Sequence, residues 1–139
     1  MKRLTIVALL LATVVAGCGG GSELTIEDPW SRPVPPVAPA SAVYLTIENG
    51  LESDVTLLGA SSESCAAMEL HETSMSSDGV MSMAPLTAGL MVPAGESARL
   101  EPGGAHLMCI DPDTSESFSV TLDLDGAAAI TVDVVIEDR

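Results

Sequence analysis

Short alternating runs separated by turn signals restrict this chain to a β-rich fold. From residue 24 onward no stretch keeps the 3.6-residue apolar repeat of an amphipathic helix, whereas apolar and polar residues repeatedly alternate. The dipeptides Asn49-Gly50, Asp78-Gly79 and Asp125-Gly126 are strong turn signals. We therefore expect a single all-β domain, an antiparallel β-sandwich or barrel without helices. The predicted strands are residues 24–28, 42–48, 55–60, 66–71, 80–86, 97–100, 105–110, 118–124 and 128–137.

The residues before this domain have the pattern of an export signal. Lys2 and Arg3 precede an apolar run that is too short to span a bilayer comfortably, and small residues follow it. The run ends in Val15-Ala16-Gly17-Cys18, which resembles the bacterial lipobox, where the signal is cut before a cysteine that becomes lipidated. An ordinary cleavage site beside a chance cysteine is the alternative. We predict a lipoprotein signal peptide at 1–17, a lipidated Cys18 and flexible tether at 18–23, and the domain at 24–139, on the extracytoplasmic face of a bacterial membrane (periplasm or cell envelope).

The charge of the exported part excludes one class of partner. Residues 18–139 hold all twenty Asp and Glu but only Arg32, Arg99 and Arg139 as fixed positive charges, which gives a formal charge of −17. Nucleic acid and anionic lipid surfaces are therefore not expected partners, because both are bound through basic patches. Solubility is the simplest explanation of the charge, and concentration of cations near the protein is the alternative.

Two cysteines remain once Cys18 is assigned to a lipid. Cys65 and Cys109 form an even pair in an exported protein, where the oxidising environment favours a disulfide. Two buried free thiols, or one thiol recruited to a metal, are the other readings, and the spacing in the sequence does not choose among the three.

Both histidines and most of the methionines lie in one segment. His71 is followed after eleven residues by Met83, and after a further twenty-two by His106, with Met108 two positions later. His106 and Met108 lie two apart in a predicted strand, so their side chains leave the same face. The turn at 78–79 brings His71 back towards Met81 and Met83.

The types of side chain in this segment select copper. A thioether is soft and neutral and matches Cu(I), while imidazole suits both oxidation states of copper. A thioether also has no proton to lose and does not pair into disulfides outside the cytoplasm. We therefore expect a Cu(I) site, although any single methionine here could instead fill space. The expected ligands are His71, Met83, His106 and Met108, with Met81 as an optional extra, whereas Met68, Met75 and Met91 are assigned to core or surface.

Enzymatic readings find little support in these residues. Residues 71–75 have Met75 where the zinc-protease motif needs its second histidine, and no pair suitable for nucleophilic catalysis is evident. We expect a non-enzymatic, monomeric protein. A small electron-transfer copper protein is one alternative, but its Cys, His and Met ligands normally follow in that order, and no histidine follows Cys109. A β-sandwich adhesion or assembly module with an incidental His and Met cluster is the other.

Several segments resemble the bacterial PCuAC-type periplasmic copper chaperones, over nearly the whole domain from residue 24 to 136. The motif of that family is His, usually Met, ten residues, Met, twenty-one residues, His, any residue, Met. The resemblance implies that its four copper ligands correspond to His71, Met83, His106 and Met108. The similar segments are 42–48 (AVYLTIE), 59–73 (GASSESCAAMELHET), 79–85 (GVMSMAP), 92–95 (VPAG) and 100–108 (LEPGGAHLM).

The chain departs from this motif at two points. Glu72 stands where the family often has Met, which removes an optional sulfur, and the second gap has twenty-two residues, most simply through one extra residue in the loop at 88–91. The resemblance implies a cupredoxin-like β-sandwich and transfer of copper towards the CuA centre of cytochrome c oxidase, often together with a Sco-type thiol protein.

Overall fold

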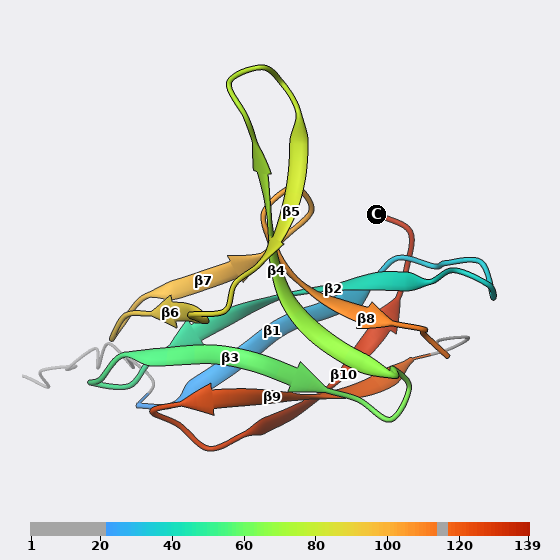
Figure 1. Ribbon diagram of the computed structural model, residues 1–139. Helices are drawn as coiled ribbons and strands as arrows, with labels where there is room; N and C mark the ends of the chain where they lie inside the picture. The colour runs from blue at the N-terminus through green and yellow to red at the C-terminus, as the bar shows by residue number, and fades with distance from the viewer. Residues whose placement is uncertain (1–21, 114–116) are drawn as a thin grey trace, which may run out of the picture.

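Ten strands form the regular structure of the computed structural model, which describes residues 22–113 and 117–139 (Figure 1). The predicted signal peptide and Cys18 lie outside the described residues. Within the described ranges there is no helix, and hence none that is long and apolar enough to cross a membrane. The strands are β1 (Leu24–Ser31), β2 (Ala40–Asn49), β3 (Val55–Ser61), β4 (Ala67–Met75), β5 (Met81–Pro85), β6 (Leu90–Val92), β7 (Ser97–Leu100), β8 (Ala105–Ile110), β9 (Phe118–Asp125) and β10 (Ile130–Ile136).

The all-β prediction is confirmed, and the sheet is mixed rather than fully antiparallel. The strands follow the order β5-β4-β8-β2-β1-β10-β9-β3-β6, and β7 pairs with β2 outside this path. All neighbours are antiparallel except β1 and β10, which run parallel with Trp30 opposite Val135. This parallel pair joins the two ends of the domain. It could not be predicted from turn signals, because these indicate pairing only between strands that are close in sequence. The sheet does not close, because β5 and β6 remain at its ends.

The core lies between the inward-facing side chains of the folded sheet. In β2, the alternate residues Val43, Leu45 and Ile47 are almost completely buried. The same alternation occurs in β9, where Phe118, Val120, Leu122 and Leu124 are buried. Burial of such side chains stabilises the fold by about 1.5–3 kcal/mol each.

A disulfide joins Cys65, just before β4, to Cys109 in β8. The Cα atoms of the two cysteines are 5.3 Å apart, and both residues belong to the buried core. The readings of two free thiols or of a thiolate metal ligand therefore do not apply to this structure. The bond fastens together β4 and β8, the two strands that carry both histidines.

The strands β4 and β5 form a hairpin that projects from the rest of the domain (Figure 1). The turn predicted at Asp78-Gly79 is present: the amide of Gly79 donates to the carbonyl oxygen of Ser76 at 2.9 Å, and Gly79 has a φ of 77° that favours glycine. The amide of Ser76 donates to the carbonyl oxygen of Val80, also at 2.9 Å. This closure sets the register of the hairpin, with Met75 opposite Met81. The strand predicted to end at His71 thus continues four residues further.

Candidate metal centre

Strand register places the four predicted ligands on one face of the sheet. On β4 and β8, His71 pairs with His106. Paired residues project to the same side of a sheet, as do residues two apart in one strand. Met108 follows His106 by two and pairs with Glu69, which precedes His71 by two, so both belong to this face. Met83 pairs with Thr73 and joins the same face from β5.

The ring of His106 is buried and held by the backbone. Its residue is 4% exposed, and Nδ1 lies 3.0 Å from the carbonyl oxygen of Gly104. A carbonyl only accepts, so Nδ1 carries the proton and donates it, which leaves the lone pair of the neutral ring on Nε2. The backbone therefore fixes Nε2 as the nitrogen of His106 that is available to a metal.

The ring of His71 is held by a carboxylate, and one of its nitrogens is left without a partner. Nε2 lies 2.9 Å from Oε2 of Glu69, and the side chain of His71 is 14% exposed. Nδ1 is buried and, among the described residues, has no hydrogen-bond partner. Because Nε2 donates its proton to Glu69, Nδ1 carries a lone pair. This lone pair is shielded from water, and no hydrogen bond from the described residues compensates for the lost hydration. A carboxylate that binds the far nitrogen of a histidine is a common arrangement behind a metal-binding imidazole.

The separation of the two imidazole rings suits a shared ion. Their centroids lie 6.1 Å apart, and their planes are inclined by 73°. With a nitrogen-to-metal bond of roughly 2 Å, as at zinc, two rings that bind one ion can have centres up to about 6.4 Å apart. The observed separation lies within this limit, so the paired strands already bring the two imidazoles close enough to share one ion.

The methionines differ in how close they lie to this pair. Met108 is half-buried beside Glu69 in the register, whereas the side chain of Met83 is 58% exposed at a position diagonal to His71. Met81 is opposite Met75, four residues along β5 from Pro85, the residue that faces His71. Four residues of strand span about 14 Å, so Met81 lies too far out to bind together with the histidines.

Aromatic residues continue the same face on the other side of His106. The ring of Tyr44 lies 6.4 Å from that of His106, and the rings of Tyr44 and Trp30 are 4.7 Å apart. Burial raises the pKa of the Tyr44 phenol, although the charge of Arg32 opposes this effect, so the group stays neutral at physiological pH. The histidine pair is therefore bordered by aromatic rings towards β1 and by methionines towards β5.

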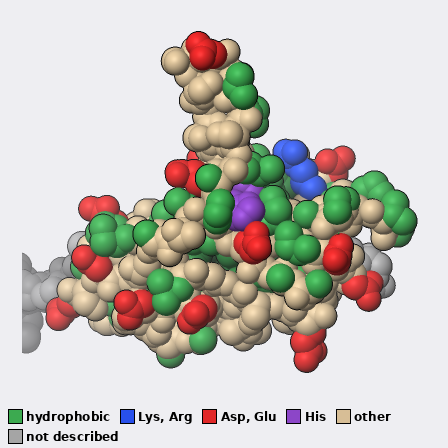
Figure 2. Space-filling view, viewed as in Figure 1, with side chains coloured by type: hydrophobic (Ala, Val, Ile, Leu, Met, Phe, Trp, Pro, Cys, Tyr) green, Lys and Arg blue, Asp and Glu red, His purple; other side chains and the backbone are tan. Residues whose placement is uncertain are grey.

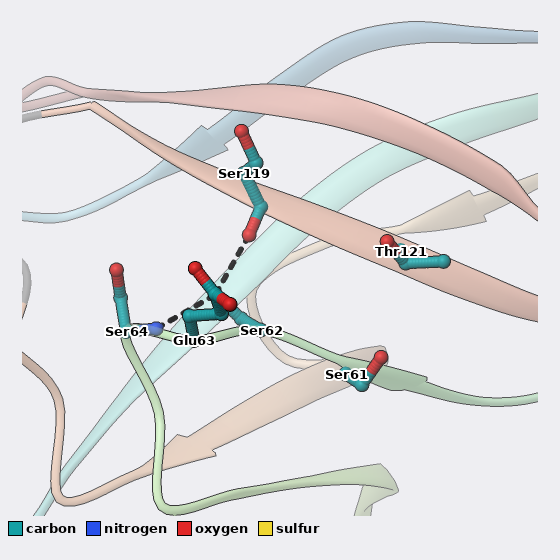
Figure 3. A pocket seen from close by; sticks show the side chains of 6 residues that line it. All are labelled: Ser61, Ser62, Glu63, Ser64, Ser119 and Thr121. Carbon is teal, nitrogen blue, oxygen red and sulfur yellow. Dashed lines mark hydrogen bonds between the residues drawn. The ribbon is translucent and has the colours of Figure 1, made fainter.

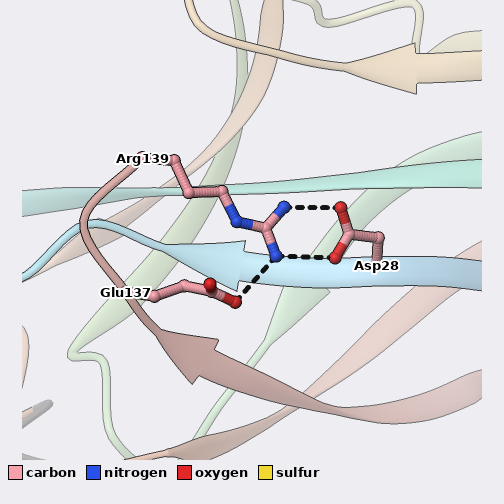
Figure 4. Close-up of polar contacts among 3 residues, drawn as sticks. All are labelled: Asp28, Glu137 and Arg139. Atoms are coloured by element: carbon pink, nitrogen blue, oxygen red, sulfur yellow. Dashed lines mark hydrogen bonds and ion pairs between the residues drawn. The ribbon is translucent and has the colours of Figure 1, made fainter.

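Arg139 lies against Trp30, the aromatic residue farther from His106. Its guanidinium binds Asp28 through two hydrogen bonds, of 2.5 and 2.7 Å, and Glu137 through one of 2.7 Å (Figure 4). It also lies 4.9 Å from the centre of the Trp30 ring, within range of a cation–π contact. The hydrogen bonds from Arg139 lower the pKa of the Asp28 carboxyl below its usual 3.8. We call Asp28, Glu137 and Arg139 the Arg139 cluster.

The histidines lie at the base of the projecting hairpin, on an open face of the molecule. Figure 2 shows their side chains bordered by hydrophobic ones. A separate surface hollow is lined by hydroxyl groups and one carboxylate (Figure 3). There Ser62 donates to the carbonyl oxygen of Ser119 at 2.7 Å and accepts from the amide of Ser64 at 3.2 Å. Oxygen groups of this kind do not match a soft metal ion. The hollow is lined by Ser61, Ser62, Glu63, Ser64, Ser119 and Thr121.

No group of three or more His, Cys, Asp and Glu residues suited to a metal occurs in the described part of the chain. The donors that share a face with the two histidines are the carboxylate of Glu69 and the thioethers of Met108 and Met83. Sequence reasoning did not single out Glu69, Tyr44 or Trp30. Glu69 could have been found from its spacing, because it lies two residues before His71 in a predicted strand and so shares its face.

Comparison with known sequences places the chain in a family. The family described as "LpqE-like: Putative lipoprotein LpqE-like" matches residues 24–136. "Putative lipoprotein Lxx21020" of Leifsonia xyli subsp. xyli is 28% identical over 102 residues, which cover 70% of this chain and 61% of that protein. "Uncharacterized protein RP573" of Rickettsia prowazekii is 26% identical over 115 residues, covering 78% and 63%. The chain thus spans less than two thirds of the length of these relatives.

Several solved structures have the same fold. The copper-bound PCuAC domain from PmoF2 superposes with a TM-score of 0.69 at 20% identity, covering 86% of this chain and 95% of that one. The solution structure of apo-DR1885 from Deinococcus radiodurans gives 0.62 at 21% identity, covering 100% and 95%, and that of CuI-DR1885 gives 0.61 at 22% identity, covering 88% and 83%. The predicted resemblance to PCuAC domains is confirmed for the fold. Because the family match takes in nearly all of the described domain, this chain belongs to the LpqE-like family.

Proposed function

We propose that this protein is a Cu(I) carrier that holds one ion among His71, Met83, His106 and Met108 and passes it to another copper protein. The observation that carries the proposal is the buried Nδ1 of His71, which has no partner among the described residues although the ring lies 6.1 Å from that of His106. A buried acceptor without a partner is costly unless a ligand completes it. Register adds two thioethers on the same face, and this donor set favours Cu(I) over harder ions.

The exposure of the ligands suggests an order of release. His106 is buried, His71 is largely covered, and the two rings are held by Gly104 and Glu69, whereas Met83 is 58% exposed. An incoming ligand from a recipient would therefore displace the thioether of Met83 first, while the imidazoles keep the ion in place. The ion exchanges ligands one at a time and stays Cu(I), so the transfer needs neither an oxidant nor a reductant.

The recipient and the location complete the proposal. The resemblance of the sequence motif to the PCuAC-type chaperones implies delivery towards a cuproenzyme such as the CuA centre of cytochrome c oxidase, directly or through a Sco-type protein, and the likeness in fold to a copper-bound PCuAC domain agrees with copper binding. The names of the family and of the Leifsonia relative support a lipoprotein, in agreement with the lipobox-like residues that end in Cys18. We propose a monomer anchored by lipid on the extracytoplasmic face of the membrane, without enzymatic turnover.

The disulfide bears on the electron-transfer alternative. A blue-copper site needs a cysteine thiolate as ligand, and in the structure Cys65 and Cys109 are joined to each other. Of the two copper functions, a carrier with histidine and methionine ligands is therefore the better supported.

The test is an anaerobic titration with Cu(I) in competition with a chromogenic chelator. We expect one tightly bound ion, and X-ray absorption of that complex should show both nitrogen and sulfur neighbours. The Met83→Leu, Met108→Leu double variant keeps the apolar volume, so its affinity should fall by more than about tenfold while the fold is kept. Met91→Leu is the matched control, because Met91 is 59% exposed on β6 and pairs with Thr56 of β3 rather than with a strand that carries a histidine. Unchanged affinity in the double variant, or a site without sulfur, would show that the proposal is wrong.

A further inference from the structure

Three exposed methionines line one face of the hairpin beyond the candidate metal centre. The residues Met75, Met81 and Met83 are 68%, 62% and 58% exposed. Met75 pairs with Met81, and Met83 follows Met81 by two residues, so all three lie on the same face as His71. The opposite face is polar, with the hydroxyls of Ser74 and Ser82 3.1 Å apart.

Packing does not explain these methionines within the described part of the chain. Methionine normally fills irregular gaps in a core, but here each side chain is more than half exposed on a hairpin that projects from the domain (Figure 1). A two-stranded hairpin of this kind is at best marginally stable, and the described structure packs nothing against its methionine face. The one-sided placement of three thioethers therefore calls for a ligand.

The register brings the sulfur atoms within reach of one ion. Directly paired residues of an antiparallel ladder have Cβ atoms about 4.5–5.5 Å apart, so the flexible side chains of Met75 and Met81 can meet over the hairpin face. Met83 lies about 7 Å along the strand from Met81, within the reach of a third long side chain. The turn at Gly79 holds this register, because it fixes Met75 opposite Met81.

Charge and ligand type agree on the ion. The hairpin strands and their turn, residues 67–85, contain Glu69, Glu72 and Asp78 but no lysine or arginine, so a cation meets no fixed positive charge there. Thioethers are neutral and soft, bind hard divalent ions poorly, and select Cu(I).

We propose that Met75, Met81 and Met83 form a second, weaker Cu(I) site made of thioethers alone, which exchanges its ion with the histidine centre through Met83. This deepens the proposed function and rests on it, since Met83 would belong to both sites. Met83 lies diagonal to His71 on one side and two residues from Met81 on the other. An ion can therefore move along the hairpin by exchange of one ligand at a time, and the outer site is where it enters or leaves.

The experiment follows the methionine methyl groups of the full chain by NMR, with 13C-labelled methionine, during anaerobic titration with Cu(I). The first equivalent should shift Met83 and Met108, and a second, weaker one should shift Met75 and Met81 and move the Met83 signal again, because both sites share Met83. The Met75→Leu, Met81→Leu double variant should keep the first equivalent and lose the second, and Cu(I) transfer to a chelator should slow several-fold. Met91→Leu should change neither, and circular dichroism should show all variants folded.

The outcomes separate the two proposals. A single equivalent with shifts at Met83 and Met108 alone would overturn the outer site and leave the carrier function intact. Shifts at Met75 and Met81 without a tight site at the histidines would support the outer site and overturn the inner one. A second equivalent that persists in the Met75→Leu, Met81→Leu variant would place it elsewhere and contradict this inference. If wild type binds no second ion and the variant slows transfer only to a protein acceptor, the methionines are a docking surface and the inference is wrong.

Discussion

His71 and His106 occupy directly paired positions on β4 and β8, and each ring is oriented by a different acceptor, the carboxylate of Glu69 and the carbonyl of Gly104. The acceptors leave Nδ1 of one ring and Nε2 of the other to carry the lone pairs. The disulfide fastens the same two strands. Both imidazoles are therefore oriented before any metal arrives, which lowers the ordering cost of binding.

Substitution of Glu69 should weaken the histidine centre without loss of the fold. Glu69→Ala removes the acceptor that orients His71, and we expect Cu(I) affinity to fall by about 10- to 100-fold. Glu69→Gln should restore part of the loss, because its amide oxygen still accepts from Nε2. Competition titrations at one fixed pH measure both. Glu72→Ala is the control, since Glu72 lies on the opposite face, and an equal loss in that variant would refute a positioning role for Glu69.

Reduction of the Cys65–Cys109 disulfide should lower the free energy of unfolding by about 4 kcal/mol, the value for a bond that closes a loop of this length. The sequence separation of the two cysteines is 44 residues. Urea unfolding of oxidised and reduced protein measures the difference, and Cys65→Ala, Cys109→Ala provides a second comparison. Cu(I) stoichiometry of the oxidised protein should be independent of thiols. A tight site that forms only after reduction would contradict this expectation.

The hydrogen bonds of the Arg139 cluster should persist to a lower pH than the ordinary pKa of an aspartate would suggest. The pKa of Asp28 is lowered in the folded protein, so its contribution to stability is present above the ordinary 3.8 and is lost as pH falls through the lowered folded value. Trp30 is the only tryptophan and lies against Arg139, so its fluorescence reports the change. We expect a transition in wild type with a midpoint below pH 3.8.

Asp28→Asn tests the assignment of that transition. Asp28 has a φ of 50°, a left-handed conformation that asparagine also adopts readily, so the substitution removes the charge without adding strain. The variant should show the acid-type emission of Trp30 already at neutral pH, whereas Glu27→Gln should behave like wild type. Superimposable pH curves for wild type and Asp28→Asn would rule out the cluster as the source.

Cys18→Ser should release the protein from membranes or leave its signal uncleaved, because the lipid would have no thiol to attach to. Cys18 lies outside the described residues, so this prediction rests on the lipobox-like sequence and on the names of the relatives. Fractionation of cells into membrane and soluble material, combined with intact mass, tests it. An unchanged distribution would show that the chain is not anchored through this residue.

Much of the fold could be predicted because one-sided burial leaves an alternating pattern. The strand predicted at 105–110 has the same bounds as β8, and the prediction that His106 and Met108 share a face agrees with the register. The continuation of β4 to Met75 could not be predicted, because β4 leaves β8 after Glu72 and its last residues are mostly exposed, so burial imposes no alternation there. The parallel pairing of β1 with β10 joins distant segments, which local patterns do not encode.

The site was harder to predict than the strands. The sequence pattern places both Met81 and Met83 near His71. Which of the two can act as a metal ligand depends on the register of the hairpin, because they lie about 7 Å apart along β5. That register is set by how the turn closes between Ser76 and Val80, which the dipeptide Asp78-Gly79 signals without specifying. Spacing puts Glu69 on the same face as His71, but the hydrogen bond between the two side chains depends on their rotamers, which spacing does not give.

The projection of the β4–β5 hairpin divides the centre between two regions of unequal local stability. Backbone hydrogen bonds around the turn, from Ser76 to Val80, stay within the hairpin, whereas β8 is paired on both sides and crosses the core. The outer part of the hairpin, residues 74–83, can therefore open and reclose without unfolding of the domain, and its amides should exchange with solvent faster than those of β8. An ion bound by both His106 and Met83 would couple the two regions. Loading with copper should then slow amide exchange in the hairpin far more than in β8, so the lifetime of the bound ion would be set in part by how often the hairpin opens.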